Sequence, residues 1–503
     1  MLIWRKQQRM PRWGLFGILV LLLVSCGIPG ETTQTDPPQL TSPRPRSTQV
    51  EPTEAVPTPT APTQIERGDW PTYLMDNGHS GFNKEENIIT RETASSLEQH
   101  WTYHARGAIS TQPMIAFGKI FWGSWDGLEH ATDMYGHEVW STNLGKTQTC
   151  GFTIGVASTA TATSIEIKGA ITPVILVGGG NATFYALNAN TGSVIWKTPL
   201  GMPPNNFIYS SPVIYQQSVY IGMASFGDCP AVQGKLFQMN LATGAIQHTF
   251  NVVPDGCIGG GIWSSPTIDD DSGELYLSTG SLDKCWTEEV YVTSLVELQA
   301  SDLKYVGSWQ VPRSEWVIDS DFGASPTLFE ATIGGATRSL VGVAHKNGTY
   351  YAFTRGAIGN GPAWRAHVAQ GGSCPSCGFG SMAPSAWDST RLYVAGGSTT
   401  IKGTSCKGSL LALHPATGAV LWAKCLSSGP VLGAVTAIPG VVAVASGSVV
   451  ELVEATSGET LFTFHDPESG SNFEGAPSIS KGSLFIGNAK GTLYSFGLGM
   501  SEE

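Results

Sequence analysis

The cysteines are the residues of this 503-residue chain whose spacing says most about chemistry. One lies near the N-terminus, and the other eight are Cys150, Cys229, Cys257, Cys285, Cys374, Cys377, Cys406 and Cys425. In an exported chain an even number of thiols favours structural disulfides, although the sequence does not assign the pairs. Cys374-Pro-Ser-Cys377 could close locally, serve as a redox CxxC motif or supply half of a zinc site. No second CxxC motif exists, and no histidine follows Cys377 as haem attachment requires.

A glycine run, an aspartate run and the overall charge bear on whether the chain binds phosphate, calcium or nucleic acid. Gly178-Gly-Gly180 is not followed by the helix that a phosphate-binding loop needs, so we predict a turn at a strand end. Asp269-Asp-Asp271 carries carboxylates suited to calcium, but a solvated hairpin loop is the favoured interpretation. Acidic residues outnumber basic ones by 40 to 28, which gives a formal charge of −12. Such a surface repels phosphates, so we expect no nucleic-acid partner.

The first 25 residues are predicted to be an export signal. Four basic residues between positions 5 and 12 precede an apolar run, 13–24, that is shorter than the roughly 20 residues a bilayer span needs. The run ends in Leu-Val-Ser-Cys26, which resembles the lipobox of bacterial lipoproteins. We therefore expect cleavage before Cys26 and acylation of its thiol, which anchors the chain to a membrane. A signal with a chance cysteine and an uncleaved anchor are the alternatives.

Residues 26–66 are predicted to form a disordered tether. They are rich in Pro, Thr and Ser and carry few large apolar residues, so they cannot bury enough surface to offset the entropy lost on ordering. We expect this tether to hold a globular domain, residues 67–503, at the membrane surface outside the cytoplasm, either in the periplasm or on the cell surface.

A repeated unit predicts the architecture of the globular domain. Residues 186–196 read ALNANTGSVIW, and residues 412–422 read ALHPATGAVLW. Weaker copies occupy 131–140, 239–250 and 453–462, and degenerate ones occupy 298–309 and 352–364. In each unit a strand ends at a small residue, a Thr-Gly-type turn follows, and the next strand carries an aromatic side chain that can pack against the neighbouring unit.

A second signal raises the number of units to eight. A strand that opens with two small residues and usually proline recurs at 112–113, 159–160, 211–212, 265–266, 325–326, 383–384, 434–435 and 476–477. Short strands and glycine-rich turns at a period near 50 residues predict an all-β, eight-bladed propeller of four-stranded antiparallel blades. Because the C-terminal unit lacks its last aromatic strand, we predict that the strand around Trp101 closes that blade.

The Thr-Gly/Trp unit resembles the tryptophan-docking repeat of two kinds of protein, the pyrroloquinoline-quinone (PQQ) dehydrogenases and the barrel-assembly scaffold lipoproteins. The stretch Asp69–Gly81, DWPTYLMDNGHSG, resembles the start of these propellers. The similarity covers about residues 69–497. It implies the propeller fold but leaves the function open, because the repeat residues are structural.

The resemblance to quinoproteins implies residues for each task of a PQQ site. Trp263, in a segment like that of the stacking tryptophan, would be the platform for the ring. Asp319 or Asp321 would be the catalytic base, and Lys346 would be the cation at the quinone oxygens. Calcium would be the accompanying metal in such a site.

The departures from the quinoprotein pattern concern the metal and the disulfide. Ser281 stands where the family has an asparagine ligand for calcium, and Asp228 is a weak substitute for the glutamate ligand. Adjacent cysteines and a haem motif are both missing from the sequence. We therefore favour a monomeric binding or scaffold module that contacts an envelope protein or glycan. A PQQ- and calcium-dependent dehydrogenase acting on an alcohol or sugar is the alternative.

Overall fold

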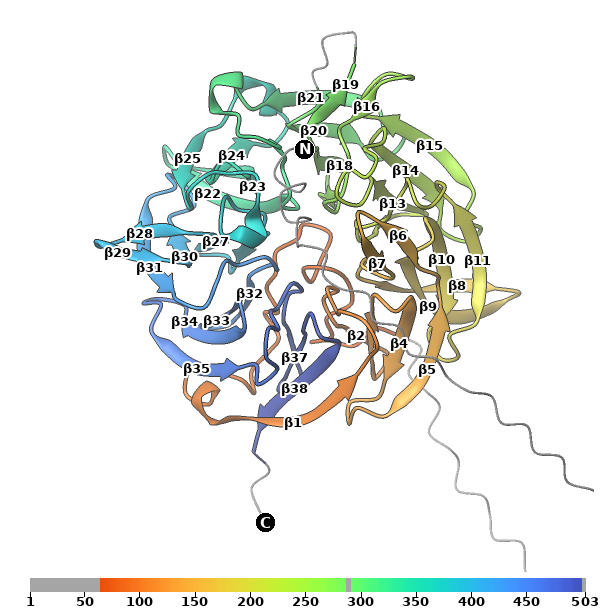
Figure 1. Ribbon diagram of the computed structural model, residues 1–503, viewed down its shortest axis with the longest axis horizontal. Helices are drawn as coiled ribbons and strands as arrows, with labels where there is room; N and C mark the ends of the chain where they lie inside the picture. The colour runs from red at the N-terminus through yellow and green to blue at the C-terminus, as the bar shows by residue number, and fades with distance from the viewer. Residues whose placement is uncertain (1–63, 286–290, 500–503) are drawn as a thin grey trace, which may run out of the picture. The chain divides into compact units, whose positions relative to one another are not determined.

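Eight four-stranded antiparallel sheets form a closed ring in the part of the chain that the computed structural model describes, residues 64–285 and 291–499 (Figure 1). The predicted eight-bladed propeller is thereby confirmed. The predicted signal peptide, Cys26 and nearly all of the predicted tether lie outside the described residues. None of the helices within the described ranges is long and apolar enough to cross a membrane.

Each blade is numbered here in chain order and its strands run from the axis outward. Blade 1 consists of β2 (Met114–Ala116), β3 (Lys119–Gly123), β4 (Leu128–Thr132) and β5 (Glu138–Asn143), and blade 2 of β8 (Thr161–Ile167), β9 (Ala170–Gly178), β10 (Thr183–Asn188) and β11 (Val194–Pro199). Blade 3 consists of β12 (Val213–Tyr215), β13 (Ser218–Met223), β14 (Lys235–Asn240) and β15 (Ile246–Asn251), and blade 4 of β17 (Thr267–Ile268), β18 (Glu274–Ser278), β20 (Ser294–Gln299) and β21 (Tyr305–Gln310).

Blade 5 consists of β22 (Thr327–Ile333), β23 (Ala336–Ala344), β24 (Thr349–Thr354) and β25 (Trp364–His367), and blade 6 of β26 (Ala386–Trp387), β27 (Leu392–Gly396), β30 (Gly408–Leu413) and β31 (Val420–Leu426). Blade 7 consists of β32 (Thr436–Ile438), β33 (Val441–Ser446), β34 (Val449–Glu454) and β35 (Thr460–His465), and blade 8 of β36 (Ser478–Ser480), β37 (Ser483–Gly487), β38 (Thr492–Leu498) and β1 (Leu97–His104).

Short elements decorate the connections between these strands. They include three two-stranded sheets. Two are hairpins, β6 (Thr147–Thr149) with β7 (Phe152–Ile154) and β28 (Thr399–Ile401) with β29 (Thr404–Cys406), and the third pairs β16 (Ile258–Gly259) with β19 (Leu282–Lys284), which are separated in the chain by β17 and β18. The 3-10 helices of the described ranges are η2 (Ala94–Ser96), η3 (Arg313–Glu315), η4 (Ile358–Asn360) and η5 (Pro375–Cys377).

The repeat residues hold each blade to the next. Trp196 of β11 donates its Nε1–H to the carbonyl of Leu241, in the turn of blade 3, at 3.2 Å. A Cβ at Gly244 of that turn would lie 2.4 Å from the Trp196 ring, and Gly244 has φ +71°. The turn glycine is needed for its positive φ and also for the close approach of the neighbouring tryptophan.

The ring is closed by the strand predicted for that purpose. β1 pairs in an antiparallel manner with β38, so the last blade contains strands from both ends of the domain. Trp101 of β1 donates its Nε1–H to the carbonyl of Met134 in blade 1, at 3.0 Å, as the other docking tryptophans do between successive blades. Such closure ties the first and last repeats together, and the ring leaves only short, protected sheet edges.

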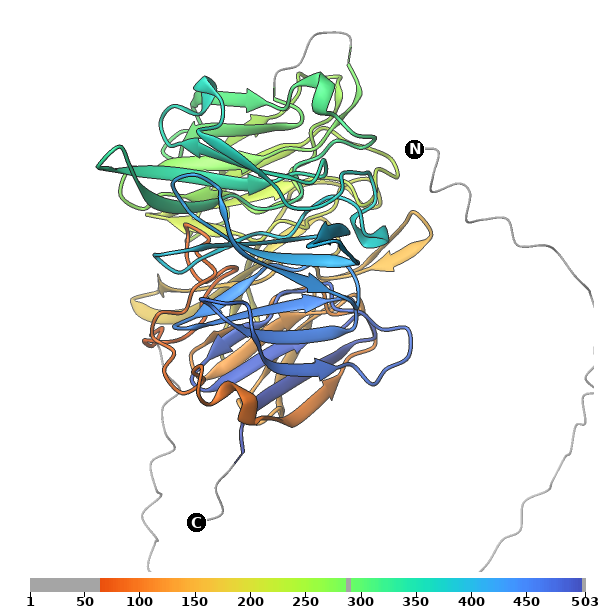
Figure 2. The ribbon, with the colours of Figure 1, turned by 90° about the vertical axis from the view of Figure 1, so that its left-hand side faces the viewer.

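A strap that precedes β1, residues 69–86, ties the ring together from within (Figure 1, orange). It lies on the opposite side of the ring from the β6–β7 hairpin (Figure 2). Its hydrogen bonds reach the innermost strand of every blade, at Ile115, Ala162, Ile214, Ile268, Leu328, Trp387, Ala437 and Ile479. The Asp69–Gly81 motif therefore contacts the innermost strands of blades 1 to 7 in turn, mostly through its backbone, and Asn83, just after the motif, reaches blade 8.

The antiparallel order of strands separates the connections into two faces. Connections between blades, and those between the second and third strands of a blade, emerge on one side of the ring, called here the upper face. The four disulfides of the described residues lie toward this face. Three lie in or between such connections, Cys150–Cys229, Cys257–Cys285 and Cys374–Cys377, and the fourth joins Cys406 of the β28–β29 hairpin to Cys425 near the end of β31. The predicted disulfide bonding is confirmed, and the cross-links are concentrated on one face.

Candidate functional site

Trp263, Asp319, Asp321 and Lys346 come together on the upper face of blades 4 and 5. Trp263 lies just before β17, the two aspartates lie just before β22, and Lys346 lies in the turn between β23 and β24. All three connections emerge on the upper face, so the ring brings these side chains toward one another although they are separated in the sequence. Their roles remain predictions, but their proximity is a feature of the fold.

Lys346 is the centre of this cluster. Its Nζ lies 2.8 Å from Oδ2 of Asp319 and 2.7 Å from Oδ2 of Asp321. The same Nζ lies 5.3 Å from the centroid of the Trp263 ring, within the range of a cation–π contact. The Lys346 side chain is only 7% exposed. A buried ammonium is thus held by two carboxylates beside an aromatic face.

The two aspartates differ in their surroundings and in their pKa shifts. Burial raises the pKa of Asp319 to about 6, and the negative charge of Asp321 adds to this shift, against the opposing effect of Lys346. Burial also acts to raise the pKa of Asp321, but Lys346 and the backbone N–H of Ser281, 2.5 Å from its Oδ1, outweigh burial and lower it. Asp321 is the fixed anion, and Asp319 is able to exchange a proton near neutral pH.

Lys346 itself stays protonated. Burial acts to lower its pKa, but the two carboxylates outweigh burial and raise it above its ordinary value. The neighbouring His345 is buried, and burial lowers its pKa to about 4, so the imidazole is neutral. Its Nδ1 accepts the backbone N–H of Asn347 at 3.0 Å, which helps to fix the turn that carries Lys346. Sequence reasoning did not single out His345, and its only signal was its place beside Lys346.

Glycines allow the site to pack this closely. A Cβ at Gly323 would lie 2.2 Å from Cη2 of Trp263. A Cβ at Gly280 would lie 3.3 Å from Oδ1 of Asp321 and 3.2 Å from the carbonyl of Gly261. Any larger residue at 323 would displace the ring of Trp263, so the platform and the charged cluster are positioned together.

Asp228 and Ser281, the two weak calcium candidates, lie at the edge of the cluster. Burial raises the pKa of Asp228, with a further contribution from the charge of Asp321 and an opposing one from Lys346. Ser281 contributes its backbone N–H to Asp321 rather than an oxygen ligand. Asp269 of the three-aspartate run pairs instead with Arg355 at 2.9 Å. Among the described residues, no group of three or more His, Cys, Asp or Glu side chains could hold a metal ion. Because Asp319 and Asp321 are paired with Lys346 and Ser281 faces Asp321 with its N–H, these candidate side chains do not assemble the set of oxygen ligands that calcium prefers.

The residues present do fit a flat, anionic quinone. Trp263 is partly exposed and offers an aromatic face, and Lys346 offers a permanent positive charge beside that face. A ring bound there would stack on Trp263 with its oxygens toward Lys346, while Asp319, whose side chain is 33% exposed, stays accessible to a second molecule.

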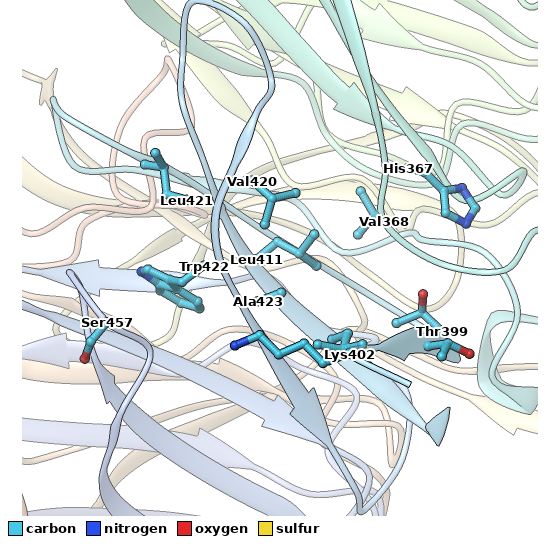
Figure 3. Close-up of a pocket in the computed structure, with 12 residues that line it drawn as sticks. His367, Val368, Thr399, Lys402, Leu411, Val420, Leu421, Trp422, Ala423 and Ser457 are labelled. Atoms are coloured by element: carbon cyan, nitrogen blue, oxygen red, sulfur yellow. The ribbon is translucent and has the colours of Figure 1, made fainter. Parts of the chain in front are cut away.

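A separate groove of about 550 Å³ lies at the outer edge of blade 6. It lies beneath the β28–β29 hairpin and is lined by residues such as His367, Lys402, Leu411 and Trp422 (Figure 3). None of the four clustered residues lines this groove, so it is not part of the candidate site.

The fold and its docking tryptophans define a PQQ-repeat propeller. The family model PQQ_2, described as outer membrane protein assembly factor BamB, matches residues 84–223, 128–283 and 345–498. The chain belongs to this family.

Characterised relatives of the chain are dehydrogenases. Polyvinylalcohol dehydrogenase of a Pseudomonas species is 24% identical over 416 residues, 70% of this chain and 61% of that protein. Quinohemoprotein alcohol dehydrogenase of Comamonas testosteroni is 23% identical over 331 residues, 57% of this chain and 45% of that protein. The crystal structure of the Comamonas enzyme superimposes with a TM-score of 0.69 at 18% identity, covering 87% of this chain and 82% of the other. The chain thus spans about three fifths or less of the length of these curated relatives.

Proposed function

We propose that the propeller is the dehydrogenase domain of a PQQ-dependent enzyme that oxidises an alcohol. The observation that carries this proposal is the Lys346 ammonium, bound by Asp319 and Asp321 and placed beside the face of Trp263. A structural role alone would not require a buried cation held by one buried and one partly exposed carboxylate next to a partly exposed indole. The similarity to polyvinylalcohol and quinohemoprotein alcohol dehydrogenases supports the same class of reaction.

Each of the four side chains has a task in this proposal. PQQ, when bound, supplies an electrophilic carbonyl that accepts the hydride from the alcohol carbon. Trp263 binds and orients the flat ring, and Lys346 places a positive charge at its oxygens. Asp319 accepts the hydroxyl proton of the alcohol, because its pKa of about 6 leaves it ionised and basic at neutral pH. Asp321 keeps Lys346 charged and in place.

A binding or scaffold role is the second candidate. It is favoured by the absence of a metal-ligand group among the described residues and by the BamB description of the matching family model. In this case the disulfide-bonded upper face would bind an envelope protein or a glycan, and the four-residue cluster would be a structural ion pair.

We also propose that the domain works outside the cytoplasm, anchored through a lipid on Cys26. The formation of disulfides by all eight cysteines of the described chain supports an oxidising compartment. Mass spectrometry of the N-terminal peptide from cells that process lipoproteins tests this point: a diacylglyceryl group on Cys26 is expected, and an unmodified thiol contradicts it.

The dehydrogenase proposal is tested by loading the full chain, purified in detergent, with PQQ. We expect quinone absorbance to remain with the protein after gel filtration and a dye to be reduced when an alcohol is added. The variants Trp263→Ala and Lys346→Met should lose the retained absorbance, whereas the control Lys402→Met, at the distant blade 6 groove, should keep it. Loss of all quinone from the wild-type chain, with and without calcium, would favour the scaffold role, which a cross-linked envelope partner would then establish.

A further inference from the structure

A cluster of aromatic side chains occupies the upper face of blades 1 to 3, next to the blades 4 and 5 that carry the charged cluster. It is called here the aromatic wall and consists of Trp125, Phe152, Tyr209 and Phe226. Trp125 and Phe226 lie in connections between the second and third strands of their blades, and Phe152 and Tyr209 lie in connections between blades. All four therefore belong to the face on which Lys346 lies.

Phe226 is the centre of the aromatic wall. Its ring centroid lies 6.0 Å from that of Trp125, 6.0 Å from that of Phe152 and 5.9 Å from that of Tyr209, the last pair being stacked. Phe207 and Ile154 are fully buried behind the wall, but Phe152 is 41% exposed and the other three members are partly exposed. A continuous aromatic surface, rather than a closed core, faces the solvent here.

The wall is held in place before any ligand arrives. Cys150 and Cys229 form a disulfide between the loop that carries Phe152 and the loop that carries Phe226. The hydroxyl of Thr149 also donates to the carbonyl of Cys229 at 2.6 Å. A preformed apolar surface binds with less loss of conformational entropy than a mobile one.

The loop that carries Phe226 also packs against the segment that leads to Trp263: a Cβ at Gly261 would lie 3.0 Å from the Cβ of Ala224, two residues before Phe226. Asp228 lies two residues after Phe226, and Ser225 donates to it at 3.1 Å. The charges of Asp321 and Lys346 both act on Asp228, which places it within electrostatic reach of the cluster. The loop of residues 225–229 thus runs from the apolar surface to the edge of the site.

The polar groups of the wall are few. Of its two polar side-chain groups, the Nε1–H of Trp125 already donates to Ser110 at 2.9 Å, which leaves the hydroxyl of Tyr209. A sugar would bring several hydroxyls that such a surface cannot pair, and burying an unpaired hydroxyl is unfavourable. An aromatic or aliphatic body would lose little and would bury apolar area.

We propose that the aromatic wall binds the apolar body of the substrate, so that the substrate is an alcohol carried on an aromatic or extended aliphatic group rather than a free sugar. This inference rests on the proposed dehydrogenase function. The hydroxyl end of such a substrate lies toward Asp319, and the body lies against Phe226 and its neighbours.

The test compares the full chain with two variants of the wall and one control. Phe226→Ala removes the central ring, Phe226→Leu keeps apolar volume without the ring, and Tyr135→Ala removes an aromatic residue that is 77% exposed in a turn of the lower face. With PQQ-loaded protein, kcat/KM is measured for 3-phenyl-1-propanol, ethanol and glucose.

We expect the kcat/KM of Phe226→Ala to fall about 10- to 100-fold for the phenyl alcohol and at most about twofold for ethanol. The Leu variant should lose less, and the control should match the wild type. Equal preference for the phenyl alcohol in wild type and Phe226→Ala, or a wild-type preference for glucose, overturns the inference.

A second measurement separates this inference from the proposed function. Saturation-transfer NMR of 3-phenyl-1-propanol with cofactor-free protein reports contact with the wall without any turnover. We expect a signal in the wild type and in Tyr135→Ala, and a clear loss in Phe226→Ala. If no variant retains quinone, the dehydrogenase proposal fails, and this binding alone decides whether the wall is an apolar ligand site. An unchanged signal in Phe226→Ala overturns the proposal that the aromatic wall binds this ligand.

Discussion

Asp319 and Asp321 each lie within 2.8 Å of the same ammonium, that of Lys346, but their pKa values move in opposite directions. Asp321 is more deeply buried and accepts a backbone N–H in addition to the ammonium. Asp319 is one third exposed and is repelled by Asp321. A pair of carboxylates with separated pKa values is the arrangement that assigns a general base in many enzymes.

The pH dependence of the reaction is the first prediction. Wild-type kcat/KM should fall on the acid side with an apparent pKa near 6, because protonated Asp319 cannot accept the hydroxyl proton. Asp319→Asn should reduce kcat/KM by about 10²- to 10⁴-fold. Asp321→Asn removes a negative charge that raises the pKa of Asp319, so it should move the acid limb to lower pH. A limb that stays at pH 6 in Asp321→Asn, or full activity in Asp319→Asn, contradicts this assignment.

The second prediction concerns the buried ion pair. Lys346→Met leaves two carboxylates without their cation and should lower the free energy of unfolding by about 3 kcal/mol at neutral pH. In this variant both aspartates have folded pKa values above those of the unfolded chain. The folded state of the variant therefore binds more protons, and its deficit should shrink as the pH falls toward 4.

Urea unfolding curves of wild type and Lys346→Met at several pH values measure this effect. Lys402→Met, in the solvent-facing β28–β29 turn, is the matched control and should change stability by less than about 0.5 kcal/mol. A deficit in Lys346→Met that is the same at pH 4 and pH 7.5 would mean that lost packing, rather than uncompensated charge, is responsible.

A buried glutamate in blade 1 gives the third prediction. Glu129 is fully buried, and neither carboxyl oxygen has a hydrogen-bond partner in the described structure. It pairs in register with Gly123, whereas the equivalent partners of Gly178 and Gly222 in blades 2 and 3 are Phe184 and Leu236. A core position of the repeat thus holds a carboxyl group, and burial raises its pKa well above the usual range.

Replacing this glutamate with leucine should stabilise the protein. Glu129→Leu is expected to raise the free energy of unfolding by about 1 to 3 kcal/mol at pH 7.5, because a lone buried carboxyl is unfavourable. A raised folded pKa means that the wild type loses stability as pH rises above about 4.3, so the advantage of the variant should grow with pH. Glu330→Leu, on the exposed face of β22, serves as the control. A destabilised Glu129→Leu would indicate that the carboxyl has a partner of its own.

The fourth prediction concerns acid sensitivity of the strap. His79 is fully buried, its Nδ1 lies 2.8 Å from Oγ1 of Thr267 in blade 4, and burial lowers its pKa to about 3. Its folded pKa lies below the unfolded value of about 6.5, so the stability it contributes is complete above pH 6.5 and declines as the pH falls.

His79→Asn should therefore be less stable than wild type at pH 7.5 but should lose less stability between pH 7.5 and pH 5. Thermal or urea unfolding at the two pH values measures the stability of each protein. Subtracting the wild-type value from that of the variant removes the contributions of the other titrating groups, which the two proteins share. Parallel loss of stability in the two proteins would show that His79 does not titrate on unfolding.

The ring architecture could be predicted from the sequence because its signals are local. A Thr-Gly-type turn and a tryptophan four residues after its glycine define a hairpin and its docking side chain within one repeat, and each repeat contacts mainly its neighbours. Even the closure by the strand around Trp101 followed from counting strands. A family resemblance identified the four candidate residues Trp263, Asp319, Asp321 and Lys346. No local sequence pattern predicted that the ammonium of Lys346 would contact the other three side chains.

Long-range proximity is what only the tertiary structure decided. The pairing of Cys150 with Cys229, 79 residues apart, depends on which upper-face loops meet, and so does the assembly of the aromatic wall around Phe226. The same is true of the strap: its DWPTYLMDNGHSG motif gives no hint that residues 69–86 contact the innermost strand of every blade. Repeat residues determine how a blade folds and docks on the next. Which loops meet on the upper face depends on the closed ring, because closure places connections from distant parts of the sequence beside one another.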